Sequence, residues 1–207
     1  MNTFREQIMG RVKAALAPLP QRAARPDWDR DLVILRQAHG LTDAWPLFAE
    51  RLKAVNGTPL DSVPALVALL EKGGHRHGYC DPAFWPEFKK HFPANFTVET
   101  TFERTRVDDF QFGITLAAGA IAETGTLILS DHTTSSRLGA LAPWVHVAVL
   151  RRSQIHQDIP SAVAALPDDP NVIWVTGPSK TADVEGILIE GVHGPGVQVG
   201  LLLPLSE

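Results

Sequence analysis

A carboxylate, Glu123, stands between an apolar run and a glycine in the stretch GAIAETGT at 119–126. A carboxylate at the end of a buried strand can lie on the floor of a cleft, where partial burial raises the pKa of a glutamate toward neutrality. The glycine at 125 lets a substrate come close to the backbone. We therefore expect Glu123 to act as a nucleophile or general base. The alternative is a glutamate that fixes a β-turn through hydrogen bonds.

A polar run, SDHTTSSR at 130–137, follows the next apolar segment. Ser, Asp and His stand side by side there, yet consecutive side chains of an extended segment point to opposite faces, which argues against a catalytic triad. A hydroxyl-rich loop that ends in a helix cap at Ser136 is the better interpretation. Arg137 could then hold a substrate carboxylate or phosphate in a bidentate fork, and we count Ser136 and Arg137 as candidate substrate-binding residues. A capped turn with a solvated arginine is the alternative.

The stretch TGPSKTADVE at 176–185 combines a Gly-Pro turn with hydroxyls and charges ahead of a predicted helix. The first amides of a helix favour an anion, so Ser179, Lys180 and Thr181 are candidate substrate-binding residues. Asp183 already complements the helix dipole, so a phosphate would have to compete with it. Asp183 could instead be a site carboxylate itself. Neither an ATP nor an NAD motif is present.

Histidines occur in three different settings. His193, bracketed by glycines in GVHGP at 191–195, has an irregular backbone and an imidazole that titrates near neutral pH, so we expect it to be catalytic or to contact an anion. His146 lies inside a predicted strand, where packing is the more frequent role. His75, His77 and Cys80 match no common zinc spacing, so we expect no metal site.

The elements that must position these residues alternate between strands and helices. Strands are predicted at 97–102, 113–116, 120–123, 126–130, 145–150, 171–176 and 197–203, and helices at 3–17, 43–55, 62–72, 155–166 and 182–190. This order predicts an α/β domain with a largely parallel sheet flanked by helices, and with hairpin-like pairing around Gly119 and Gly125. The carboxyl ends of such strands are where we expect the site.

Composition narrows the class of protein. The 207 residues have a formal net charge of −4 without a basic stripe, which argues against nucleic acid as the main partner. The amino-terminal segment is too polar for a signal peptide and no apolar run has membrane-spanning length, so we expect a cytoplasmic protein without a membrane span. The single cysteine, Cys80, cannot supply the thiolates of an iron–sulfur cluster.

The long stretch TGPSKTADVEGILIEGVHGPGVQVGLLLP at 176–204, with GAIAETGTLILS at 119–130 and PWVHVAVL at 143–150, resembles the LutC/YkgG family of lactate-utilization proteins, the LUD domain group. The resemblance covers the chain from about Phe96 onward. It implies a NagB/RpiA/CoA-transferase-like α/β fold. We expect a single LUD domain over 1–207, of which 1–60 is a helical N-terminal extension.

The same resemblance implies a role in oxidising L-lactate to pyruvate beside iron–sulfur subunits. The chain would then bind no cofactor alone, and the clusters would belong to partner subunits. We expect an accessory or substrate-handling subunit that binds a small carboxylate in one strand-end cleft, lined by Glu123, Arg137, Lys180, Asp183 and His193. The alternative is a free-standing CoA-transferase-like enzyme with Glu123 as acyl nucleophile, although the chain is about half the size of such enzymes.

Overall fold

The protein is described by a computed structural model covering residues 3–18, 40–134, 136–166, 169, 171–182 and 186–203. The chain divides into two compact units, Met1–Leu35 and Arg36–Glu207. The first unit contains helix α1 (Phe4–Leu16), as the sequence predicts. A capping box fixes its start, because the Thr3 hydroxyl accepts from the amide of Glu6 while the Glu6 carboxylate accepts from the amide of Thr3.

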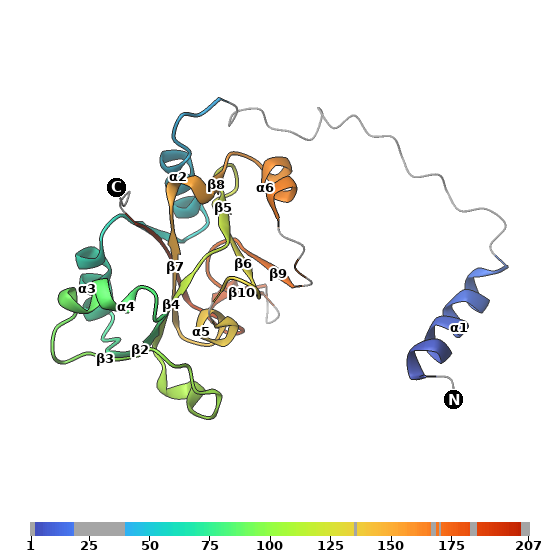
Figure 1. Ribbon diagram of the computed structural model, residues 1–207, viewed down its shortest axis with the longest axis horizontal. Helices are drawn as coiled ribbons and strands as arrows, with labels where there is room; N and C mark the ends of the chain where they lie inside the picture. Colours follow the sequence, from blue (N-terminus) through green and yellow to red (C-terminus); the bar gives the residue numbers. More distant parts are fainter. Residues whose placement is uncertain are drawn as a thin grey trace. The chain divides into compact units, whose positions relative to one another are not determined.

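The second unit is built on a six-stranded sheet in which every strand is parallel to its neighbours. The strands follow the order β1-β12-β7-β4-β2-β3. Figure 1 labels four of them, β7, β4, β2 and β3. Their bounds are β1 (Thr58–Leu60), β2 (His77–Cys80), β3 (Thr97–Glu99), β4 (Phe112–Leu116), β7 (Val145–Leu150) and β12 (Val197–Leu202). The predicted parallel sheet is confirmed. Since all six strands point the same way, the sheet has one amino end and one carboxyl end.

Helices cover both faces of this sheet. They are α2 (Trp45–Ala54) and α5 (Arg137–Leu141) on one face, and α3 (Val63–Lys72) and α4 (Trp85–Phe88) on the other. Helix α6 (Ile159–Ala165) packs instead on a second, smaller sheet. The 3-10 helices are η3 (Lys89–His91), η4 (Arg104–Asp109) and η5 (Arg152–Gln154). In strand β7, Val147 packs in a core with α3 and α4, whereas its neighbour Ala148 packs in a core with α2 and α5. This alternation is what a strand buried on both faces requires.

A second sheet of four strands, ordered β8-β5-β6-β9, packs on the face of the six-stranded sheet that α2 and α5 cover. Its strands are β5 (Gly119–Ile121), β6 (Thr126–Ser130), β8 (Ile155–His156) and β9 (Val172–Val175). The β5–β6 hairpin turns at Gly125, whose φ of 65° is left-handed and whose added Cβ would lie 2.4 Å from the Leu52 backbone nitrogen. The predicted turn at this glycine is therefore confirmed, and it also allows close contact with α2.

The predicted helix at 182–190 is wrong. Lys180–Thr181 forms strand β10 and pairs antiparallel with β11 (Ile189–Glu190). Gly186 has a φ of 71°, which ends any helical run there. The predicted helix at 155–166 is shorter than expected, since its first residues form β8.

The segment expected to be a helical extension, residues 1–60, contains α1 and α2, but also strand β1, which pairs with β12. Phe48 and Leu52, four residues apart on α2, are fully buried. This stripe packs against the main sheet, so α2 and β1 are structural parts of the second unit.

Candidate functional site

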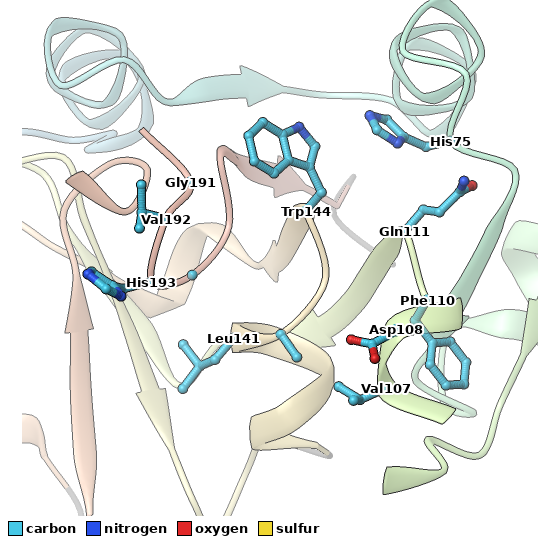
Figure 2. A pocket seen from close by; sticks show the side chains of 12 residues that line it. His75, Val107, Asp108, Phe110, Gln111, Leu141, Trp144, Gly191, Val192 and His193 are labelled. Carbon is cyan, nitrogen blue, oxygen red and sulfur yellow. The ribbon is translucent and has the colours of Figure 1, made fainter. Parts of the chain in front are cut away.

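A pocket of about 590 Å³ opens at the amino end of the six-stranded sheet (Figure 2). Segments that lead into β2, β4, β7 and β12, together with the end of α5, form its walls. The lining residues are His75, Val107, Asp108, Phe110, Gln111, Leu141, Ala142, Trp144, Gly191, Val192, His193 and Gly194. Because parallel strands begin side by side, residues far apart in sequence meet here. The pocket lies at the opposite end of the strands from the predicted cleft.

Trp144 forms one wall of the pocket and is 47% exposed. The loop that follows β11 closes on its indole: an added Cβ would lie 2.3 Å from the ring at Gly191 and 2.4 Å at Gly196. Gly191 also has a left-handed φ of 83°. The glycines therefore let backbone pack directly on the indole, which is held in place while nearly half of its surface stays open.

His193 lies in this same loop and lines the pocket. The loop is braced by Ser179, whose amide donates to the carbonyl of Pro195 at 2.9 Å and whose carbonyl accepts from the amide of Gly191 at 2.8 Å. The structure thus brings two predicted residues, Ser179 and His193, to one loop. The bonds that Ser179 makes here are backbone bonds that shape the wall.

Gln111 and His75 form a polar part of the wall. Gln111 Oε1 accepts from the amides of Arg76 at 2.6 Å and His77 at 3.1 Å, which fixes the orientation of its side-chain amide. Its Nε2 group has no hydrogen-bond partner among the described residues, so two donors remain. Burial lowers the pKa of His75, which favours the uncharged form of its imidazole.

Asp108 belongs to η4 and directs its carboxylate toward the pocket (Figure 2). Arg106 anchors η4, because its guanidinium donates to both oxygens of Glu99 at 3.2 and 3.0 Å and to Asp109 at 2.9 Å. His77 also bonds Glu99, at 2.7 Å. The bonds from His77 and Arg106 lower the pKa of Glu99. Asp108 is thereby carried on a segment fixed to β3.

Glu123 lies outside this pocket, in the turn after β5. Its Oε1 accepts from the amide of Ile159 at 2.8 Å, and its own amide donates to the carbonyl of Gln157 at 3.1 Å. These bonds tie the β5–β6 turn to the start of α6. They match the kind of turn-fixing role that the sequence left open as an alternative, and the nucleophile role stays a prediction.

Ser136 and Arg137 stand at the start of α5. The Ser136 hydroxyl accepts from the amide of Gly139 at 2.9 Å, which is the predicted helix cap. Arg137 pairs with Asp131 through Nε and a terminal nitrogen. A carboxylate ligand at Arg137 would therefore have to compete with a carboxylate of the chain itself.

The remaining predicted binding residues lie on or beside the β10–β11 hairpin. Lys180 Nζ lies 3.5 Å from a carboxylate oxygen of Glu190 and donates to the carbonyl of Val55 at 3.3 Å. Thr181 pairs with Ile189 in the hairpin. The predicted anion site at a helix start has no helix to supply it, and Asp183 lies outside the described residues.

A Ser–His–Asp grouping does exist, but its geometry is not that of a triad. Ser130 donates to the carboxylate of Asp169, and that carboxylate also accepts from the amides of His132 at 3.0 Å and Asn171 at 2.8 Å. These bonds lower the pKa of Asp169 to about 2. In a triad the serine donates to the histidine, so the arrangement serves to fasten a loop.

His146 is fully buried in the middle of the sheet, as its strand position suggested. Nε2 lies 2.9 Å from the Thr115 hydroxyl and Nδ1 lies 3.0 Å from Gln198 Oε1, a carbonyl oxygen that requires Nδ1 to donate. Burial lowers the pKa of His146 to about 4. Both ring nitrogens are therefore satisfied by neighbouring strands, which indicates a packing role.

Metal and membrane features are absent from the part of the chain that the structure describes. No group of three or more His, Cys, Asp or Glu side chains there could hold a metal ion. None of its helices is long and apolar enough to cross a bilayer. Cys80 is buried, and burial raises the pKa of its thiol to about 12.

Sequence reasoning missed most of the pocket. Gln111 and Asp108 belong to no motif, Trp144 lies in the family-like stretch at 143–150 without a predicted role, and the sequence raises only a metal-ligand role for His75. A usable signal was present around Trp144, because Gly191 and Gly196 flank His193 at positions where a side chain would meet the indole.

Known proteins share sequence similarity with this chain. Residues 86–202, more than half of the chain, match the LUD domain. "Lactate utilization protein C" of Deinococcus radiodurans is 34% identical over 47% of this chain and 48% of that protein, and its namesake in Bacillus licheniformis is 34% identical over 44% and 41%. These two alignments span less than half of each relative. A third namesake, from Bacillus pumilus, is 25% identical over 73% of this chain and 72% of its own length.

A solved structure supports the architecture. The crystal structure of a DUF162 family protein from Deinococcus radiodurans superposes with a TM-score of 0.56 at 23% identity, over 78% of this chain and 96% of that one. At this identity the likeness concerns the fold. Combined with the match over residues 86–202, the comparison shows that the chain belongs to the LUD domain family.

Proposed function

We propose that this protein takes part in L-lactate utilization, as an accessory or substrate-handling subunit of a complex that oxidises lactate to pyruvate with iron–sulfur clusters. The observation that carries the proposal is the LUD domain match over residues 86–202, in a chain whose relatives are named Lactate utilization protein C. Those names belong to the relatives, and the role of this chain in a complex is our own extension of them.

We place the redox centres in partner subunits. Oxidation of lactate to pyruvate releases two electrons and two protons. A cluster usually needs about four thiolates, whereas these 207 residues hold one cysteine, Cys80, whose buried thiol has a pKa raised to about 12. The partner clusters would therefore accept the two electrons one at a time, while the two protons pass to bases and solvent.

We place the carboxylate of a small hydroxy acid at the His193 end of the amino-end pocket. His193 lines an open cavity, and an imidazole can hydrogen-bond or pair with a carboxylate near neutral pH. Arg137, which pairs with Asp131, and Lys180, which pairs with Glu190, do not line this cavity. They are therefore weaker candidates for a contact in it.

An affinity pull-down of the tagged protein from lactate-grown cells tests the proposal. We expect partners that carry the visible absorbance of iron–sulfur clusters, and loss of growth on L-lactate when the gene is deleted. His193→Gln should fail to restore that growth, whereas His132→Gln, a matched change at an exposed histidine outside the pocket, should restore it. A colourless, solitary protein whose deletion leaves growth intact would contradict the role.

A further inference from the structure

We propose that the Trp144 end of the pocket binds an uncharged planar heterocycle whose rim offers carbonyl acceptors and an N–H donor. This would be a second ligand, beside the small carboxylate placed at His193. Figure 2 shows the two regions apart, with Trp144, His75 and Gln111 gathered toward one end and His193 at the other. The proposal does not depend on the role in lactate utilization.

The size of the cavity requires more than a hydroxy acid. Lactate has six non-hydrogen atoms, which at about 30 Å³ each, the share of a water molecule in the liquid, fill about 180 Å³. The pocket measures about 590 Å³. That volume lies in the range of sites that take ligands the size of a ring system with substituents. Most of the space is therefore available to a larger molecule.

Trp144 supplies a fixed stacking surface. The backbone at Gly191 and Gly196 packs against its indole, and the residue as a whole is 47% exposed. An immobilised aromatic ring loses little conformational entropy when a ligand stacks on it. Stacking between planar rings is favourable for any heterocycle and depends little on its identity.

The rim of the site selects among planar molecules. Gln111 is held by two backbone amides through its Oε1, so its Nε2 hydrogens can donate to a carbonyl of the ligand. Asp108, whose carboxylate faces the pocket, can accept from a ring N–H. An N–H beside a carbonyl group, as at N1 of guanine or N3 of the isoalloxazine of flavins, matches this pair of a donor and an acceptor.

The charges favour a neutral ring. Asp108 supplies a carboxylate, and burial lowers the pKa of His75, which favours its uncharged imidazole. Among the described residues that line the pocket, none is a lysine or arginine. An anionic ring would meet the Asp108 carboxylate without a fixed cation to compensate for it.

Riboflavin and guanosine, both uncharged, are the probes. Each is titrated into the purified full-length protein, riboflavin by quenching of its fluorescence and guanosine by calorimetry. We expect at least one to bind with a dissociation constant below about 1 mM. Trp144→Leu should weaken binding about tenfold, as loss of a stacking ring does. Trp174→Leu, at a 38% exposed tryptophan outside the pocket, should change it by less than about twofold.

Gln111→Glu is the second variant, because it keeps an oxygen for the amides of Arg76 and His77 while it replaces the NH₂ donor by a carboxylate oxygen and adds a negative charge. It should weaken binding about fivefold or more. Binding of riboflavin alone identifies an isoalloxazine site, and binding of guanosine alone identifies a purine site. Failure of both probes at about 1 mM, or full affinity in folded Trp144→Leu and Gln111→Glu, would overturn the proposal.

Discussion

The two ends of the parallel sheet use their polar side chains in opposite ways. At the carboxyl end of β7 a pocket of about 470 Å³ is lined by Asp43, Arg152 and Gln157, among others. Arg152 pairs with Asp43, while Gln157 accepts from the amide of Gly40 at 3.1 Å and donates to the carbonyl of Leu41 at 3.1 Å. These groups fasten the segment before α2 to the sheet.

At the amino end the corresponding groups face a cavity. Gln111 is held on its oxygen side only, and Trp144 keeps nearly half of its surface exposed. A polar group that is fully hydrogen-bonded within the chain has little left for a ligand. Pocket volume alone therefore does not identify a site. Hydrogen-bond donors without a partner among the described residues distinguish the pocket at the amino end, although ligands of α/β sheets usually bind at the carboxyl end.

The largest expected effect comes from breaking the amino end with Gly113→Ala. Helix α5 crosses β4 so closely there that an added Cβ would lie 1.8 Å from the carbonyl oxygen of Gly139. Either α5, which carries Leu141 of the pocket wall, or β4 must move. We expect the free energy of unfolding to fall by about 3 kcal/mol in urea denaturation. Gly10→Ala, with nothing within 4 Å of the added Cβ, is the control, and equal midpoints for both variants would contradict the packing.

His146, buried between the two ends, should make stability pH-dependent. Burial lowers its pKa to about 4, whereas an unfolded histidine has a pKa of about 6.5, so between these values the unfolded state binds more protons. The contribution of the buried, neutral His146 to the free energy of unfolding should be fully present above pH 6.5. That free energy should fall by up to about 3 kcal/mol as the pH drops to 4. His146→Gln, which retains polar contacts to Thr115 and Gln198, should flatten this part of the curve. An unchanged slope in denaturation at several pH values would show that the ring is not buried as described.

Glu123 lies outside the amino-end pocket, and its carboxylate is hydrogen-bonded within the chain to the amide of Ile159. Glu123→Gln keeps an oxygen for the Ile159 amide, so stability should change by less than about 0.5 kcal/mol, while Glu123→Ala should lose about 1 kcal/mol. Mass spectrometry after incubation with acyl-CoA should find no adduct at Glu123. An adduct that is lost in Glu123→Gln would instead support the transferase alternative.

The smallest effect is expected at the carboxyl-end ion pair. The side chains of Asp43 and Arg152 are 41% and 39% exposed, so water and salt screen their attraction. Arg152→Ala should lower the free energy of unfolding by at most about 1 kcal/mol, and the difference should shrink in high salt. A loss several times larger, independent of salt, would mean that this end is more than a surface fastening.

Much of the fold could be predicted from local patterns. The β-branched runs that became β6, β7 and β12, and the stripe of Phe48 and Leu52 on α2, carry their own periodicity. The error at 182–190 has a physical cause. The residues there include helix formers, yet pairing of Lys180 with Glu190 and a left-handed Gly186 favour a hairpin.

The site was far less predictable, because it depends on which strand ends are neighbours. Glu123 and His193 both follow the pattern of a polar residue within two positions of a glycine, but Glu123 follows β5 of the smaller sheet whereas His193 precedes β12 of the main sheet. The order β12-β7-β4-β2 places His193, Trp144, Gln111 and His75 around one cavity. No spacing in the sequence encodes that order, which arises from long-range pairing.

The decisive experiment asks whether the functional site lies at the amino end of the sheet. A deletion strain carries either Trp144→Leu or Arg152→Ala, with protein abundance matched by immunoblot, and its growth on L-lactate is measured. We expect growth to be lost with Trp144→Leu, at the amino end, and restored with Arg152→Ala, at the carboxyl end. Normal growth with Trp144→Leu together with lost growth for Arg152→Ala would contradict it, and would place the functional site at the carboxyl end of the sheet.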